Sequence, residues 1–545
     1  MGGSHRRKRR SGKDRAGNIN IDRISDLPEP IQHHILTFLP FKQVVQTSVL
    51  SKTWGLAWRT FPILDFDFTF LYQFLPGDRV GREVQPHELR DVLHYIEETL
   101  RTRHVEISIN KFSLCLTEAP LKPCQPYIDR ILEDVLGSKV KELNLVTHSV
   151  CSFNLPEMVL RSKSIEKLTL KGCTLKSPTN VNFKLSSLRK LCLSSVYVDG
   201  PVLEKLVAGC PLIEYLSLDG YLGLRSLELS GLTKLNEALI INRDTFQLLS
   251  IKALSIQKAT LEGECRLDIA SFKNLKHLKI IYVDGKDDRL SNQISKFPFL
   301  ECLILKGCRN LRSFKISSLS LKSFEMCSCL GMIEVKIEAP NLSIFKYQGS
   351  VVSFSLGALT LSESHILFRT RSLHPAQYDK YIKLLAMFYS VSKVVILRSV
   401  THTILPLMIP EDLRQTQSSP LHSVYHLDCT LEDLKYSQQW RTSLIKHTIE
   451  SLLWISPHLR TVSMRCGPLG LPARSTLKFQ FSYRRQPVYE GEMAQSCPIS
   501  CWRQCIEEVV IEEGNSTKLY IFKGKDIGKI VRFVKLHLER LSNEA

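Results

Sequence analysis

A short apolar phrase that recurs nine times constrains the fold of this 545-residue chain more than any other sequence feature. It consists of an apolar residue, two residues of any kind, a second apolar residue, one residue of any kind and a third apolar residue. Its occurrences are VKELNL (140–145), IEKLTL (165–170), LRKLCL (188–193), IEYLSL (213–218), IKALSI (251–256), LKHLKI (275–280), LECLIL (300–305), LKSFEM (321–326) and LSIFKY (342–347). All but one of the intervals between successive starts fall within the roughly 20–29 residues of a leucine-rich repeat. The exception is the longer interval between the phrases at 213–218 and 251–256.

The period of two inside each phrase predicts one short β-strand per repeat. The second and third apolar residues of such a strand point inward and stack on the neighbouring coil, while the residues between them point outward. One coil cannot bury its own leucines, so stacked neighbours complete the core. Cys173, Cys308 and Cys329 each lie three residues after the last apolar position, where these repeats place Cys or Asn. We therefore predict an α/β solenoid, a horseshoe of short parallel strands joined by helical or irregular outer segments.

The predicted solenoid extends beyond the nine phrases. A helical stripe that contains Leu93 and Ile96 leads into VEISI (105–109), and a second stripe leads into the phrase at 140–145. We place the solenoid at residues 86–365, after a linker at 68–85 that contains Pro76 and Gly81. Residues 366–545 read as irregular repeats and a C-terminal cap, which a solenoid needs to shield its last hydrophobic layer.

Residues 19–67 form a separate small module with three short helical patterns. Pro28 is suited to the start of the first pattern, and Pro40 ends it. Trp54, Trp58 and Phe61 lie four and three residues apart and therefore share one helix face. A module of this size cannot bury all of its apolar surface against itself. We therefore predict that part of this surface docks on a partner.

Leu27-Pro28, Leu39-Pro40, Ser48–Lys52 and Leu64–Asp67 together resemble the F-box of plant F-box/leucine-rich-repeat proteins. The positions of Thr53 and Gly55 commonly carry Arg in that family. CWRQCIEEVVIE (501–512) and the helix that follows it resemble the FBD region found after the repeats in many of these proteins.

The resemblance implies a non-catalytic substrate-recognition subunit of an Skp–cullin–F-box E3 ubiquitin ligase. The F-box would bind the Skp-type adaptor, and through it the cullin and RING subunits. The repeat surface would bind a protein substrate whose identity the sequence does not reveal. The expected adaptor contacts are Leu27, Pro28, Ile31, Ile35, Leu39, Val45, Val49, Leu50 and Trp54.

Outward strand positions supply the candidate substrate contacts. These are Lys167, Lys171, Lys190, Tyr215, Lys279, Ile281, Ile304 and Lys306. One interpretation is a basic concave face suited to an acidic partner. The other, which we favour, is a solvated strand face that shares the lysine excess of a chain with net charge +19. The outward apolar and aromatic residues are more informative, because such anchors dominate interface energy.

Residues 1–18 read as a disordered basic tail. The cluster of Arg6, Arg7, Lys8, Arg9 and Arg10 in this tail is either a nuclear-localisation signal or simply a solvated segment. The tail is not a secretory signal, no apolar run is long enough for a transmembrane helix, and the sixteen cysteines are expected to be free thiols. We expect a nuclear or cytoplasmic protein, or one present in both compartments, with no membrane partner.

Two alternatives to the ligase subunit remain: a leucine-rich scaffold without a role in degradation, and a basic nuclear protein that binds nucleic acid. The lysines are dispersed rather than clustered with aromatic residues, which argues against nucleic acid as the partner. Cys497, Cys501 and Cys505 lack a fourth ligand for a structural zinc site. The chain has no phosphate-binding Gly-rich loop, GxSxG or HExxH motif, so we expect no enzyme activity and no cofactor.

Overall fold

A computed structural model describes much of the chain. The described residues are 24–66, 85–103, 108–116, 121–147, 153–175, 183–220, 226–241, 248–263, 266–269, 272–283, 289–358, 361–368, 375–388, 394–399, 409–421, 424, 426–432, 442–467, 475–484, 505–513, 519–523 and 527–543. The predicted basic tail and localisation cluster, nearly all of the predicted linker, Cys497 and Cys501 lie outside these residues. The chain divides into two compact units, Met1–Gly172 and Cys173–Ala545, which we describe separately as the N-terminal and C-terminal units.

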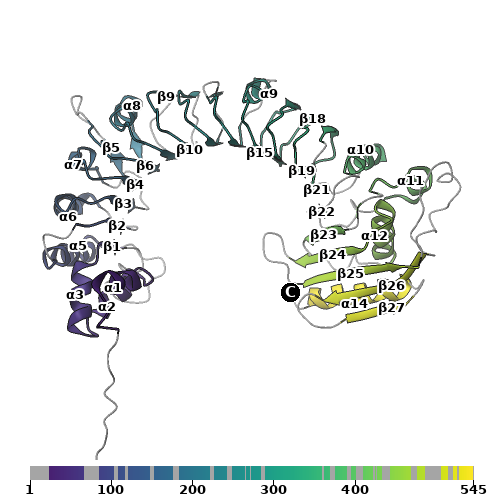
Figure 1. Ribbon diagram of the computed structural model, residues 1–545, viewed down its shortest axis with the longest axis horizontal. Helices are drawn as coiled ribbons and strands as arrows, with labels where there is room; N and C mark the ends of the chain where they lie inside the picture. Colours follow the sequence, from purple (N-terminus) through teal and green to yellow (C-terminus); the bar gives the residue numbers. More distant parts are fainter. Residues whose placement is uncertain are drawn as a thin grey trace, which may run out of the picture. The chain divides into compact units, whose positions relative to one another are not determined.

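The N-terminal unit begins with three short helices, coloured purple in Figure 1: α1 (Glu29–Leu36), α2 (Phe41–Thr47) and α3 (Lys52–Thr60). Pro28 and Pro40 immediately precede α1 and α2, where a missing backbone N–H costs little. Ser51 caps α3, because its Oγ accepts a hydrogen bond from the Trp54 backbone N–H at 3.3 Å. The three predicted helical patterns are therefore confirmed.

Parallel strands follow these helices in the same unit. They are β1 (Ile63–Phe66), β2 (Lys111–Leu116), β3 (Glu142–Thr147) and β4 (Lys167–Lys171), each paired with the next. The connecting helical segments are α5 (Pro86–Arg101), η1 (Lys122–Cys124), α6 (Gln125–Gly137) and α7 (Glu157–Leu160). Most residues of the stripes predicted on α5 and α6 are buried, including Leu93, Ile96 and Ile131.

One strand of this unit does not lie where the sequence predicted it. The strand after α5 is β2 and not VEISI (105–109): Ser108 and Ile109 are not in a strand, and 105–107 lie outside the described residues. The Pro62 carbonyl fixes the register of β2 by accepting from the backbone N–H groups of Asn110 and Lys111, at 2.9 and 3.2 Å. Phe112 and Leu114 are then buried against neighbouring strands.

The C-terminal unit confirms the predicted parallel-strand solenoid. Its main series is β6 (Lys190–Ser194), β8 (Tyr215–Asp219), β10 (Glu237–Ile241), β12 (Lys258–Glu262), β14 (His277–Ile281), β15 (Cys302–Lys306), β17 (Ser323–Cys327), β19 (Ile344–Gly349), β21 (Glu363–Phe368), β22 (Val394–Ser399), β23 (His426–Glu432) and β24 (Thr461–Gly467). Successive members pair in parallel with equivalent residues in register, as in Leu278 opposite Leu303 and Leu303 opposite Phe324. Buried and half-buried residues alternate along these strands, as the period of two predicted.

The one long interval between phrases, from 213–218 to 251–256, contains an additional strand, β10. The sequence predicted a strand of the main series in the phrase IKALSI (251–256). This prediction was wrong, because the strand is β12, which lies in the phrase IQKATL (256–261) and the residue after it. Ala238 and Ala259 are buried at positions where other coils carry a larger apolar residue. The small side chains concealed the regular spacing of these coils in the sequence.

Additional parallel strands, not predicted, run outside the main series. They are β5 (Thr174–Leu175) with β7 (Tyr197–Val198); β9 (Ser226–Leu229), β11 (Leu248–Ile251) and β13 (Arg266–Asp268); and β16 (Ser313–Ser317), β18 (Glu334–Glu338) and β20 (Ser353–Gly357). Aromatic side chains fill the core between the layers, where Phe314, Phe324 and Phe345 stack with centroids 5.8 and 6.0 Å apart.

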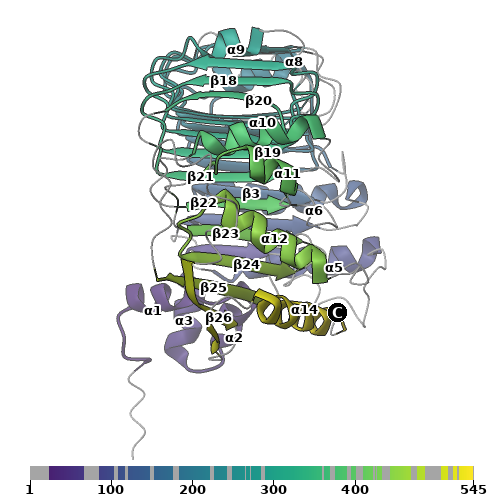
Figure 2. The ribbon, with the colours of Figure 1, turned by 90° about the vertical axis from the view of Figure 1, so that its right-hand side faces the viewer.

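A small mixed sheet ends the C-terminal unit. After β24 the pairing becomes antiparallel through β25 (Ser475–Tyr483), β26 (Ile506–Glu513) and β27 (Leu519–Lys523). The described helices of this unit are α8 (Gly200–Ala208), α9 (Arg289–Ile294), α10 (Pro375–Ala386), α11 (Glu411–Thr416), α12 (Thr442–Ile455) and α14 (Ile527–Asn543). Figure 2 shows α14 beside the antiparallel strands, and the Phe533 ring lies 4.3 Å from that of Tyr520. The sequence predicted a cap here but not the change to antiparallel pairing.

Candidate adaptor-docking surface

The three N-terminal helices share a small apolar core. Leu36, Phe41, Val44 and Trp54 are buried there, with Trp54 only 5% exposed. The Phe41 ring lies 5.0 Å from that of Phe66 in β1, so the core continues into the first strand. Trp54 therefore supports the module from inside and offers little area to a partner.

Several large apolar side chains remain outside this core. Phe38, Val49 and Leu50 are 74%, 84% and 68% exposed, respectively. Ile31 is exposed as well, and the spacing of Ile31, Ile35 and Phe38 places them on one face of α1 and the turn that follows. We call Leu27, Pro28, Ile31, Ile35, Phe38, Leu39, Val45, Val49 and Leu50 the F-box apolar surface.

This surface contains eight of the nine predicted contacts and adds Phe38. Pro28, Ile31, Val49 and Leu50 are exposed, whereas Leu27, Ile35, Leu39 and Val45 are half-buried. Phe38 was missed, although its spacing of seven residues from Ile31 would have placed it on the same helix face. Ile24 and Leu56 are also exposed and were not predicted.

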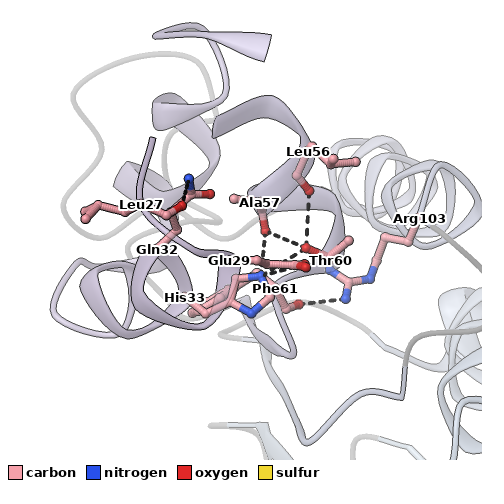
Figure 3. Close-up of polar contacts among 9 residues, drawn as sticks. All are labelled: Leu27, Glu29, Gln32, His33, Leu56, Ala57, Thr60, Phe61 and Arg103. Atoms are coloured by element: carbon pink, nitrogen blue, oxygen red, sulfur yellow. Dashed lines mark hydrogen bonds and ion pairs between the residues drawn. The ribbon is translucent and has the colours of Figure 1, made fainter. Parts of the chain in front are cut away.

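A buried glutamine orders the start of the F-box apolar surface. Gln32 is 2% exposed, and its Nε2 donates to the Leu27 backbone oxygen at 2.8 Å (Figure 3). The same nitrogen donates to the Ser25 backbone oxygen at 3.2 Å. The hydroxyls of Ser25 and Ser51 form a further hydrogen bond of 2.9 Å. These contacts attach the Leu27-Pro28 turn to α1 and to the N-terminus of α3.

A histidine joins α1 to the end of α3. The Nε2 atom of His33 lies 3.0 Å from Thr60 Oγ1 and 3.1 Å from the Ala57 carbonyl oxygen (Figure 3). Glu29 Oε1 lies 3.5 Å from the same nitrogen. Helix α1 is thereby held against the C-terminal end of α3.

A buried arginine links the helices to the repeats of the same unit. Arg103 Nη2 donates to the Phe61 carbonyl oxygen at 2.6 Å, and burial lowers the pKa of the guanidinium to about 10. Lys111 on β2 adds an ion pair of 2.9 Å with Asp65 on β1. The helical module is thus connected to the first repeats by hydrogen bonding as well as by packing.

Gly55 occupies a place where α3 approaches the turn after α2. A Cβ at this position would lie 3.3 Å from the Ser48 carbonyl oxygen, closer than most such contacts. The departure from the usual Arg at this position therefore agrees with the local packing.

The predicted substrate contacts occupy outward strand positions in both units. In the N-terminal unit, Lys167 pairs with Glu142 at 3.3 Å, and Lys171 is half-buried. In the C-terminal unit, Lys190 lies over the Tyr215 ring at 4.6 Å, and Lys306 pairs with Glu325 at 2.7 Å.

Outward charges are balanced over the described strands of the main series from β6 to β21 in the C-terminal unit. Five lysines and five acids face outward there: Lys190, Lys258, Lys279, Lys306, Lys346, Asp219, Glu237, Glu262, Glu325 and Glu363. This balance supports a solvated strand face rather than a basic one. Half-buried Ile281 and Ile304 lie on adjacent strands, and Lys279 is directly opposite Ile304.

No cluster that could hold a metal ion occurs among the described residues. None of the described helices is long and apolar enough to cross a membrane.

Comparison with known families identifies both parts of the chain. The F-box domain matches residues 24–66, which include the three helices, and the At1g61320/AtMIF1 LRR domain matches residues 100–271 and 247–409. The chain therefore belongs to the plant F-box/leucine-rich-repeat proteins, a family that is usually non-catalytic.

Individual relatives come from Arabidopsis thaliana. F-box/LRR-repeat protein At3g59200 is 32% identical over 205 residues, which cover 37% of each chain. F-box/FBD/LRR-repeat protein At1g13570 is 33% identical over 36% of this chain and 44% of the relative. F-box/LRR-repeat protein 25 is 28% identical over 42% of this chain and 78% of the relative. The match to At3g59200 covers only 37% of that relative, well under two thirds of its length.

Proposed function

We propose that this protein is the substrate-recognition subunit of an Skp–cullin–F-box ubiquitin ligase. The observation that carries the proposal is the exposure of Phe38, Val49 and Leu50 in the segment that matches the F-box domain. Burial of one such side chain by a partner contributes about 1.5–3 kcal/mol. An Skp-type adaptor is the partner that an F-box implies, and the adaptor connects to the cullin and RING subunits.

The leucine-rich repeats would hold a protein substrate near the ubiquitin carried by the other subunits. Such a receptor accelerates transfer through proximity and orientation, without catalytic residues of its own. Tyr215, Ile281 and Ile304 are the outward residues best suited to anchor a substrate, because aromatic and aliphatic side chains dominate interface energy. The lysines on the same strands would then set orientation rather than affinity.

Measurement of adaptor affinity tests the docking role directly. The Val49→Lys, Leu50→Lys double variant should bind a purified Skp-type adaptor at least about 100-fold more weakly, because two apolar contacts are lost. Leu319→Lys is the matched control, since Leu319 is 77% exposed but lies in the C-terminal unit. Equal adaptor affinity for the native chain and the double variant would overturn the proposal.

A second measurement separates a degradative receptor from a leucine-rich scaffold. Proteins captured by the repeats should accumulate when the proteasome is inhibited, and also when the native chain is replaced by the Val49→Lys, Leu50→Lys variant, which binds the adaptor weakly. Captured partners whose abundance responds to neither treatment would favour the scaffold.

A further inference from the structure

Strand β27 forms an edge of the described C-terminal sheet. Within the described strands, it pairs with β26 and with no other. Its five residues alternate between exposed and half-buried side chains. Tyr520 and Phe522 contact Phe533 of α14, with centroid distances of 4.3 and 5.8 Å, whereas Leu519 and Ile521 face the other way.

This edge carries the features that favour pairing with another strand. Proteins protect free edges with charged residues, prolines, bulges or a covering segment. The sequence of β27, LYIFK, has no proline and a single charge at its end, on Lys523. Leu519 and Ile521 are 60% and 59% exposed. Leu536, three residues beyond Phe533 along α14, is 66% exposed as well.

We propose that β27 pairs antiparallel with β27 of a second copy of this chain, about a two-fold axis at Ile521. This register places Ile521 opposite itself, Tyr520 opposite the second copy's Phe522, and Leu519 opposite the second copy's Lys523. Antiparallel pairs of aromatic residues are favourable, and an interface about a two-fold axis uses one surface twice. The aromatic residues on one strand face and Ile521 on the other then meet chemically matched neighbours.

The pattern of charges favours a second copy over an unrelated strand. Because Lys523 lies opposite an apolar residue, no like charges face each other across the axis. Within one sheet Lys523 is opposite Glu508 of β26, and Leu519 is opposite Glu512. The second copy's Lys523, opposite Leu519, therefore lies in the same cross-strand row of side chains as Glu512. In the central row, β26 and β27 contribute Val510 and Ile521 from each copy, so the contact at the axis is apolar.

The proposed pairing goes beyond substrate recognition, because it gives the receptor a dimeric state. A dimer carries two F-box domains and two repeat surfaces. A substrate that presents two binding segments would then bind with an avidity that neither copy provides alone.

Light scattering after gel filtration of the full chain, at concentrations up to about 100 μM, tests the pairing. We expect the native chain to approach twice its 62.3 kDa mass, whereas Ile521→Lys, which places two lysines face to face, should remain at 62.3 kDa. Leu319→Lys and Phe38→Lys should dimerise like the native chain. Their behaviour controls for general surface charge and for association through the F-box apolar surface. A circular dichroism spectrum of Ile521→Lys equal to that of the native chain shows that the variant is folded.

A native chain of 62.3 kDa at all these concentrations would overturn the pairing, as would an Ile521→Lys chain that still dimerises. If the native chain is monomeric and its β27 edge instead accepts a strand from another protein, the second-copy proposal is equally overturned. Neither result bears on adaptor affinity, so the proposed function is tested separately.

Discussion

Buried polar side chains set the geometry of the F-box apolar surface. The apolar residues supply contact area, but Leu27 and Pro28 precede α1 in a turn whose position depends on hydrogen bonds from that helix. The Gln32 amide satisfies two backbone oxygens of this turn at 2.8 and 3.2 Å. A buried amide is tolerated where its hydrogen bonds are made, and it is costly where they are lost.

Replacement of Gln32 by Ala should weaken adaptor binding and stability together. Two carbonyl oxygens lose a donor, so we expect the free energy of unfolding of the helical module to fall by about 1–3 kcal/mol. Gln43→Ala is the matched control, because Gln43 on α2 is exposed. Calorimetric titration with the adaptor and urea unfolding measure the two effects. Adaptor affinity equal to that of Gln43→Ala would show that the turn does not depend on Gln32.

The Cys210 thiol should be inert in the native protein. Burial raises its pKa to about 12, from an ordinary value of 9.0, and Sγ donates to the Leu206 carbonyl oxygen at 3.0 Å. The thiolate fraction at pH 8 is then about 1000-fold lower than in the unfolded chain. Because the folded-state pKa is the higher one, this thiol stabilises the fold fully below pH 9 and progressively less as the pH rises towards 12.

Mass spectrometry after brief iodoacetamide treatment at pH 8 checks this prediction. Cys210 should be labelled only after denaturation, whereas the half-buried Cys192 on β6 should react in the native protein. Equal labelling of both residues in the native protein would contradict the assigned burial.

At the scale of single elements, each strand divides its residues between the core and the outer surface. Leu305 on β15 is fully buried, and its neighbour Ile304 points outward. Leu305→Ala should lower the free energy of unfolding by about 2–5 kcal/mol, because the cavity left behind closes only partly. Ile304→Ala should cost much less. Denaturant unfolding of the two variants compares them directly, and similar losses would mean that the assigned faces of β15 are wrong.

A buried ion pair joins α11 to α12. Arg414 Nη1 lies 3.6 Å from Glu450 Oε2, and the two side chains are 2% and 4% exposed. Arg414→Met should destabilise the C-terminal unit by about 3–5 kcal/mol, because Glu450 then stays buried without this cation. The double variant with Glu450→Met should recover most of that loss. Thermal unfolding of both variants measures the difference, and a double variant less stable than the single one would show that the pair itself stabilises the unit.

The sequence correctly predicts those elements in which apolar residues recur at the regular spacing of a strand or a helix. Eight of the nine phrases, each with Leu or Phe at the second apolar position, contain a strand of the series. IKALSI (251–256) also has Leu there and was misplaced, because Ala238 and Ala259 concealed the strands β10 and β12. The position of β2 depends on hydrogen bonds to Pro62, which no local pattern reports. Trp54 was assigned to the adaptor surface by resemblance, and its burial depends on how α3 packs against α1 and α2. The antiparallel pairing of β24 to β27 likewise depends on contacts between residues distant in sequence, which no local pattern reports.

At the scale of the whole molecule, the proposed function assigns different tasks to the two units. The F-box apolar surface belongs to the N-terminal unit, and Ile281 and Ile304 belong to the C-terminal unit. Substitutions in surfaces that share no partners usually act independently. The adaptor and substrate functions should therefore be separable by mutation.

The Ile281→Lys, Ile304→Lys variant tests this separation. Both side chains are half-buried on outward strand positions, so the solenoid core should remain intact. We expect adaptor affinity within about twofold of the native value, because both substitutions lie in the C-terminal unit and the F-box apolar surface belongs to the N-terminal unit. Proteins captured from the native tissue under proteasome inhibition should be lost, because two apolar anchors become cations. The complementary Val49→Lys, Leu50→Lys variant should keep the captured proteins and lose the adaptor. A single substitution pair that abolishes both activities while the chain stays folded would show that the two surfaces are coupled.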